Sequence, residues 1–231
     1  MDAHTSGTSD TPPPAPASER LDAAVRDRLP GDFRAAVDFH GHLCPGLTMG
    51  YRAATIAMER LGVSPGSDEQ LVGIVENDAC GVDAFQLLTG CTMGKGNLIY
   101  KDYGKQAFTL ARRDTGAGVR VVMRPDAFET DAEHATLRER VMGGRATEDE
   151  RALFWERHIE QSVALAELPE ERFASVAEVE VDLPPKARIF ESAVCSVCGE
   201  GVMEPRSRVL GGAPCCIPCS TRHGRGWEIN E

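Results

Sequence analysis

The feature that most constrains this chain is a pair of C-x2-C motifs near its C-terminus. Cys195 and Cys198 form the first pair, and Cys216 and Cys219 form the second, with 17 residues between the pairs. Each pair places two sulfurs on one tight turn, so two turns supply the four corners of a tetrahedron. The spacing predicts a closed, structural zinc site with Cys215 as a spare thiol. Redox C-x-x-C motifs are the alternative, but neither pair has a thioredoxin-like context.

Composition narrows the class of protein. The 231 residues include 8 cysteines and carry 25 basic and 36 acidic groups, a net charge of −11. This balance argues against a basic surface for nucleic acid, and no apolar run approaches the roughly 18 residues of a membrane helix. The start MDAHTSGTSD lacks the basic and apolar parts of a secretory signal. We therefore expect a cytoplasmic protein whose reduced thiols bind metal or act in chemistry.

Proline and composition divide the chain into three parts. Residues 1–18 are small, polar and proline-rich, which predicts a disordered tail. Residues 19–183 alternate helix-like and strand-like stretches and form the predicted core domain. The pair Pro184-Pro185 then separates this core from a zinc-finger domain at 186–231.

The core has the pattern of an α+β domain with a mixed sheet packed with helices. Apolar residues recur at helical spacing over 46–61, and a second helix is expected to end at Gly90. A capping box opens a helix at 147–167. Strands are predicted from short apolar or alternating runs, at 71–76, 107–113, 119–124 and, as an edge strand, 176–183.

The densest group of reactive side chains in the core lies in the run HGHLCPG. Pro45 suits the first position of a helix, which places Cys44 at its N-cap and predicts a lowered pKa for that thiol. His40, His42 and Cys44 are two residues apart, so in an extended stretch they project to one side and share a ligand. His42 and Cys44 are thus candidate ligands for a second transition metal, such as zinc, nickel, copper or iron.

A second cysteine is expected at the start of the next helix. Cys80 follows the strand at 71–76, and Asp83 lies one turn further on the same helix face. We expect the two cysteine-bearing helix starts to converge. Cys91 comes at the far end of that helix; taken alone, a buried core thiol is the better interpretation for it.

A glycine-rich run over 90–97 invites comparison with a phosphate loop. Its spacing departs from that motif, and Gly96 replaces the residue that would hold magnesium. Lys95 is left as a candidate anion-binding or substrate-contacting side chain, with a plain turn as the equal alternative. His134 and His158 lie in charged helical stretches and are expected to be solvated.

Three segments carry a family resemblance, FHGHLCPGLTMGYRAA, ENDACGVDAFQLLTGCTMGKGNL and KDYGKQAFTLAR. Together they resemble the FmdE family of formylmethanofuran dehydrogenase subunits from about residue 33 to 170. The run CSVCGEGVMEPRSRVLGGAPCCIPC resembles a DksA/TraR-type zinc finger. The FmdE resemblance implies an α+β core, a homodimer and an active site that comprises His40, His42, Cys44, Cys80, Asp83, Cys91 and Lys95.

Two functional hypotheses follow from these residues. The first is a metal- or thiol-dependent protein of one-carbon or molybdenum/tungsten redox metabolism, whose open core site binds a small anion or polarises a carbonyl. The chain has too few clustered core cysteines for an iron–sulfur relay, so it is not expected to be a formylmethanofuran dehydrogenase on its own. The second is a non-catalytic accessory protein that docks through its zinc finger onto a dehydrogenase or the transcription machinery.

Overall fold

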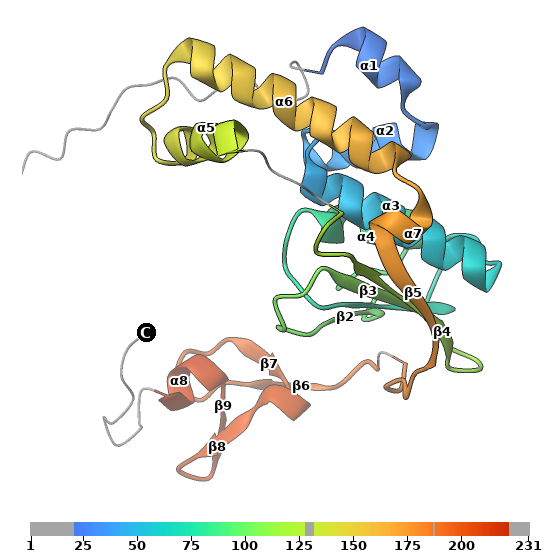
Figure 1. The fold of residues 1–231 in the computed structure, drawn as a ribbon. Helices are drawn as coiled ribbons and strands as arrows, with labels where there is room; N and C mark the ends of the chain where they lie inside the picture. The colour runs from blue at the N-terminus through green and yellow to red at the C-terminus, as the bar shows by residue number, and fades with distance from the viewer. Residues whose placement is uncertain (1–20, 128–131, 187, 222–231) are drawn as a thin grey trace, which may run out of the picture. The chain divides into compact units, whose positions relative to one another are not determined.

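A computed structural model describes residues 21–127, 132–186 and 188–221 of the chain. The predicted tail at 1–18 lies outside these residues. The chain divides into two compact units after Lys186, directly beyond the Pro184-Pro185 pair, and each unit is described by itself. Figure 1 shows both units.

The first unit is an α+β domain, as the sequence predicts. Its helices are α1 (Ala23–Arg28), α2 (Gly31–His40), α3 (Pro45–Leu61), α4 (Gly81–Thr89), α5 (Ala132–Met142), α6 (Glu148–Glu167) and α7 (Glu170–Phe173). Its strands are β1 (Leu71–Val75), β2 (Leu98–Tyr100), β3 (Ala107–Arg112), β4 (Ala117–Met123) and β5 (Ala174–Glu180).

The five strands form one mixed sheet in the order β2-β1-β3-β4-β5. β1 and β2 are parallel and are joined through α4, whereas the other neighbouring strands are antiparallel. The predicted hairpin is the β3–β4 pair, and β5 lies at the edge of the sheet, as its alternating sequence indicated. The carboxyl ends of β1 and β2 therefore point the same way, toward the start of α4.

The helices are stacked on one face of the sheet (Figure 1). α3 packs on α4 and against β3 and β4, and α6 packs on the outer side of α3. The core of the unit lies between these layers and includes Phe33, Leu47, Phe85 and Leu110, all fully buried.

Two glycines let α3 and α4 approach until their backbones touch. A Cβ built on Gly50 would overlap the carbonyl group of Gly81, and one built on Gly81 would lie 2.9 Å from the Gly46 oxygen. No side chain fits at this crossing without moving a helix. The first turns of α3 and α4 are thereby held side by side.

Helix ends follow the signals in the sequence. Gly62 and Gly90 adopt left-handed conformations after α3 and α4, which ends those helices. Thr147 and Glu150 form the predicted capping box of α6. Sequence reasoning missed α1, α2 and α5 and the short elements β2 and α7.

The second unit, residues 187–231, is a small cysteine-centred module. Its elements are β6 (Ser192–Val194), β7 (Gly201–Met203), η2 (Glu204–Arg206), β8 (Arg208–Leu210), β9 (Ala213–Cys215) and α8 (Ile217–Thr221). β6 pairs with β7 and β8 with β9, each as an antiparallel hairpin.

Candidate metal centres

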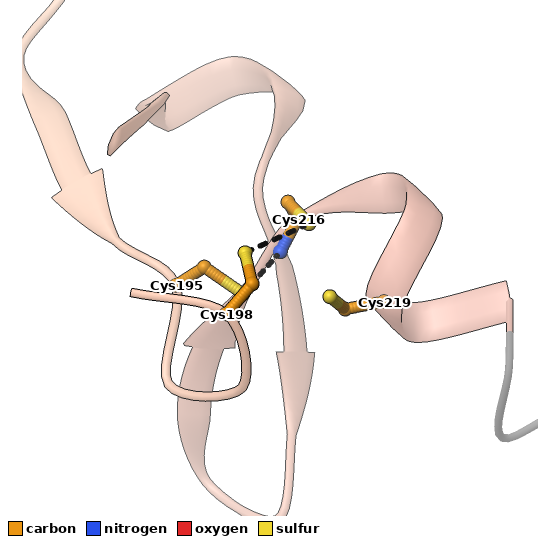
Figure 2. A group of neighbouring side chains, drawn as sticks. All are labelled: Cys195, Cys198, Cys216 and Cys219. Atoms are coloured by element: carbon orange, nitrogen blue, oxygen red, sulfur yellow. Dashed lines mark hydrogen bonds between the residues drawn. The ribbon is translucent and has the colours of Figure 1, made fainter. Parts of the chain in front are cut away.

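The four paired cysteines of the second unit converge in space. Cys195 and Cys198 lie on the turn after β6, Cys216 directly precedes α8, and Cys219 lies on that helix (Figure 2). Their sulfurs all lie within 4.8 Å of one another. Gly199 adopts a φ of 77°, which lets the chain turn back after the first pair. The predicted four-thiolate arrangement is present.

Backbone donors and crowding oppose each other in this cluster. The Cys216 amide donates to the Cys195 sulfur at 3.3 Å. Donation from backbone amides, those of Cys198, Cys216 and Val197, lowers the pKa of Cys195 to about 5. Hydrogen bonding to Cys216 and burial raise the pKa of Cys219 to about 12.

The first thiolate is thus favoured, whereas full ionisation of the cluster needs a cation. Four sulfurs in reach of one another are the donor set that structural zinc prefers, so the residues fit zinc. Cys215 is fully buried beside the cluster but is not one of these four ligands, and its sulfur contacts the Cys216 carbonyl.

A second group of metal-binding side chains lies in the first unit. It consists of His40, Cys44 and Cys80, whose ligand atoms lie within 4.8 Å of one another. His40 is the last residue of α2, and Cys44 and Cys80 are the N-cap residues of α3 and α4. Three helix ends thus meet at this point.

Local sequence explains why each helix begins or ends there. Gly41 has a φ of 91° and terminates α2 directly after His40. Pro45 occupies the first position of α3, as predicted, and the Leu47 amide donates to the Cys44 sulfur at 3.3 Å.

The backbone from His40 to Cys44 is not the extended stretch that we expected. Because α2 runs through His40 and Gly41 is left-handed, alternate residues do not project to one side. His40 joins the two cysteines, whereas His42 is outside the group. The His42 ring lies instead against the His40 ring, with centroids 4.4 Å apart, and 5.8 Å from the Trp155 ring.

Asp83 orients His40 toward the cysteines. The Nδ1 atom of His40 lies 2.7 Å from a carboxylate oxygen of Asp83, one turn into α4. The other ring nitrogen, Nε2, lies 3.9 Å from the Cys44 sulfur. A carboxylate on the far nitrogen of a ligating histidine is the usual second layer of a metal site, because it fixes the tautomer and the ring direction.

The two core thiols influence each other's pKa. The hydrogen bond from the Cys44 thiol lowers the pKa of Cys80 to about 6, and the nearby His40 contributes to this. The same contact and burial raise the pKa of Cys44. The lowered pKa that we predicted at Cys44 is therefore found at Cys80, because the first thiolate forms at the sulfur that receives the hydrogen bond.

A cleft of about 420 Å³ opens beside this group. It lies where β1 and β2 end, and its walls include both acidic and apolar side chains. The lining residues are His40, Val75, Asn77, Asp78, Ala79, Cys80, Val82, Asp83, Met93, Leu98 and Tyr100. His40, Cys80 and Asp83 therefore face open space.

Cys91 and Lys95 lie elsewhere. Cys91 is fully buried, and burial raises the pKa of its thiol. A Cβ on Gly73 would lie 3.1 Å from the Cys91 Cβ, which places this thiol against the middle of β1. The Lys95 ammonium donates to the Gly90 carbonyl at 2.8 Å, so it fastens the glycine-rich loop.

Sequence reasoning missed a row of aromatic rings behind the core group. His134 is 2% exposed and stacks on His158 at 5.8 Å, and the His158 ring lies 5.6 Å from that of Trp155. Trp155 in turn contacts His42. The expectation that His134 is solvated is wrong, because α5 packs on α6 and turns this ring inward.

Fold and sites together define a two-part metal-binding protein, an α+β domain with a cysteine-histidine cleft and a four-cysteine module. The model of the family described as "FmdE, Molybdenum formylmethanofuran dehydrogenase operon" matches residues 39–175. The chain belongs to this family. The model of the prokaryotic dksA/traR C4-type zinc finger matches residues 188–224, which identifies the second unit.

Two relatives extend the comparison. A protein of Archaeoglobus fulgidus, named a probable S-adenosyl-L-methionine-binding protein, is 38% identical over 205 residues. The match covers 83% of this chain but only 54% of that relative, so the chain spans about half of its length.

The second relative supports the fold. It is the crystal structure of an FmdE-like protein, of the tungsten formylmethanofuran dehydrogenase type, from Syntrophus aciditrophicus. It matches with a TM-score of 0.50 and 24% identity, over 81% of this chain and 89% of that one.

Proposed function

We propose that the FmdE domain of this chain holds a second metal ion on His40, Cys44 and Cys80 and uses it to activate a small ligand in the cleft. The observation that carries this proposal is the contact of His40 with Asp83 at 2.7 Å, which directs the other ring nitrogen toward two sulfurs. The first unit has a large apolar core of its own, so the contact is not needed to hold the fold together.

The donor set distinguishes this site from the zinc finger. Two sulfurs and one imidazole leave a tetrahedral ion with an open position, as in catalytic zinc sites. An ion bound there would supply Lewis-acid polarisation of a carbonyl or activation of a water molecule. Asp83 holds a proton on His40 Nδ1, and the cleft admits the ligand.

The setting of the activity is part of the proposal. The family description names a molybdenum formylmethanofuran dehydrogenase operon, which supports a role in one-carbon or molybdenum/tungsten redox metabolism beside an oxidoreductase. The name of the archaeal relative supports S-adenosylmethionine as a candidate ligand, although that relative is nearly twice as long as the matched region.

Metal stoichiometry of the full-length protein tests the site, because the finger supplies an internal reference of one ion. We expect two ions per chain in the wild type and one in Cys44→Ala and in Cys80→Ala. Cys91→Ser is the matched control and keeps two. A wild type with a single ion, or a Cys44→Ala variant with two, would overturn the proposal.

A second candidate function is docking of a protein partner through the finger. The finger exposes large apolar side chains, with Ile189, Val209 and Val194 at 103%, 79% and 67% exposure. Monomeric surfaces rarely gather such groups without a partner.

Affinity purification at modest salt separates the two functions. Co-elution of an oxidoreductase or RNA polymerase that is lost in Val209→Asp favours docking, and elution alone disfavours it. A sizing column run on the same sample measures the homodimer that the family resemblance implies.

A further inference from the structure

The cleft beside the core group lies at a place where α/β folds commonly bind nucleosides. β1, α4 and β2 form a parallel crossover, and Val75 and Tyr100, at the ends of the two strands, both line the cleft. Ligands of such units bind outside the carboxyl ends of the strands, next to the start of the connecting helix. The cleft volume of about 420 Å³ falls in the usual range for a small organic ligand, roughly 300–1,000 Å³.

The rim of the cleft offers surfaces for a flat ring. Met93 and Tyr100 line it and remain 71% and 41% exposed, so neither side chain is used by the core. A phenol ring and a polarizable thioether both pack well on aromatic faces. The remaining apolar wall residues, Val75, Ala79 and Val82, leave room above them because their side chains are small or short.

An acidic side chain follows directly after the second parallel strand. Asp102 comes two residues after the end of β2, and its hydrogen bond and charge raise the pKa of the Tyr100 phenol. The charge of Asp78, which lines the cleft, acts on Tyr100 as well. In nucleotide-binding crossovers, a carboxylate after the second strand accepts hydrogen bonds from the ribose hydroxyls.

The charge of the cleft excludes phosphates. Within the described part of the chain, no lysine or arginine belongs to the lining residues, whereas Asp78 and Asp83 do. The lysine of the nearby glycine-rich loop is committed to backbone carbonyls, those of Gly90 and Gly66. The crossover therefore has the acid that recognises a sugar and lacks the cradle for a phosphate.

We infer that this cleft binds a neutral or cationic nucleoside, with the base against Met93 and Tyr100 and the ribose on Asp102. The 5′ substituent then extends toward His40 and Cys80. The inference deepens the proposed function and rests on it only for what the 5′ substituent meets. Base and ribose contacts use none of the proposed metal ligands.

Isothermal titration of the full-length, metal-loaded protein tests this assignment with defined probes. We expect adenosine and S-adenosylmethionine to bind, and AMP and ATP to bind at least 10-fold more weakly. 2′-Deoxyadenosine should lose about 10-fold because one ribose hydroxyl is missing, in line with about 1–1.5 kcal/mol per hydrogen bond. Failure of adenosine and S-adenosylmethionine to bind at millimolar concentration, or equal binding of AMP, would overturn the inference.

Variants locate the site on the cleft. Tyr100→Ala and Asp102→Asn should each weaken adenosine binding at least 10-fold while both metal ions are retained. Tyr103→Ala is the matched control, since Tyr103 is 59% exposed in the same loop but does not line the cleft. Unchanged affinity in both Tyr100→Ala and Asp102→Asn would contradict the placement.

The two proposals fail separately. Adenosine binding should persist in Cys44→Ala, which lacks the proposed core ion. Loss of the second ion from the wild-type count, with adenosine still bound, would remove the metal proposal and leave the nucleoside site. Two ions without adenosine binding would do the reverse.

Discussion

The two thiol centres of this chain are built in opposite ways. In the finger, four ligands come from residues 195–219, and the buried residues among those described at 188–221 are Cys195, Cys215 and Cys219. In the FmdE domain, the three candidate ligands lie at the ends of three helices packed on a large apolar core. In one centre the ligands build the fold, and in the other the fold presents the ligands.

The largest expected effect follows from breaking the closed centre. Cys198→Ser should remove the finger's zinc and unfold residues 188–221, because structural zinc contributes about 10–16 kcal/mol in comparable modules. Limited proteolysis with zinc analysis measures both effects, and the FmdE domain should stay resistant. Cys215→Ser is the control and keeps its zinc. Retention of zinc by Cys198→Ser would remove the four-thiolate assignment.

The next effect tests whether the core centre depends on helix packing. Gly50→Ala places a methyl group into the Gly81 carbonyl, so α4 must move away from α3. Overpacking of this kind costs about 1–3 kcal/mol or more. Urea unfolding should show the loss, and the core ion should be released while finger zinc is unchanged. Gly94→Ala, where a Cβ meets nothing within 4 Å, is the matched control. Full stability in Gly50→Ala would contradict the close crossing.

A milder change separates the two centres at the level of ligand orientation. Asp83→Asn keeps the shape of the side chain but weakens its hold on His40 Nδ1. Loss of such a partner typically lowers metal affinity by about 10–100-fold. Competition with a chromophoric chelator should show this drop for the core ion alone. An equal drop for the finger ion would mean that the variant disturbs the whole protein.

The smallest effect concerns acid stability of the FmdE domain. Burial, and the charges of His134, His42 and Arg138, lower the pKa of His158 to about 4 from its ordinary 6.5. The unfolded chain therefore takes up this proton first, so stability present above pH 6.5 is lost as pH falls toward 4.

Because His158 is only partly buried, we expect about 1–2 kcal/mol of loss from this group. Urea unfolding of wild type and His158→Phe at pH 7 and pH 5, followed by tryptophan fluorescence, should show a smaller acid loss in the variant. An identical pH dependence would exclude His158 as the cause.

Much of the fold could be predicted, because long periodic segments bury a continuous face. α3, α4 and α6 and the strands β1, β3 and β4 follow from apolar spacing and from caps such as Gly62, Gly90 and Thr147. The order of strands could not be read from the chain. β3 lies between β1 and β4 because of pairings between distant segments, which no local pattern records.

The candidate site shows the same division. The position of Cys44 at a helix start follows from Pro45, and the structure does bring it close to Cys80. The place of His40 could have been inferred from Gly41, since a glycine after a periodic segment is a common helix stop. The burial of His134 could not, because its charged neighbours hide the packing of α5 on α6.

The contact between Gly50 and Gly81 has a consequence for which ion the core centre accepts. The two helices carry Cys44 and Cys80 at their first turns, so the backbone contact works as a fixed spacer that sets the bite of the two sulfurs. A larger residue at either glycine would widen that bite without touching an ion. Size discrimination among soft metal ions is thereby encoded in two residues that have no side chain.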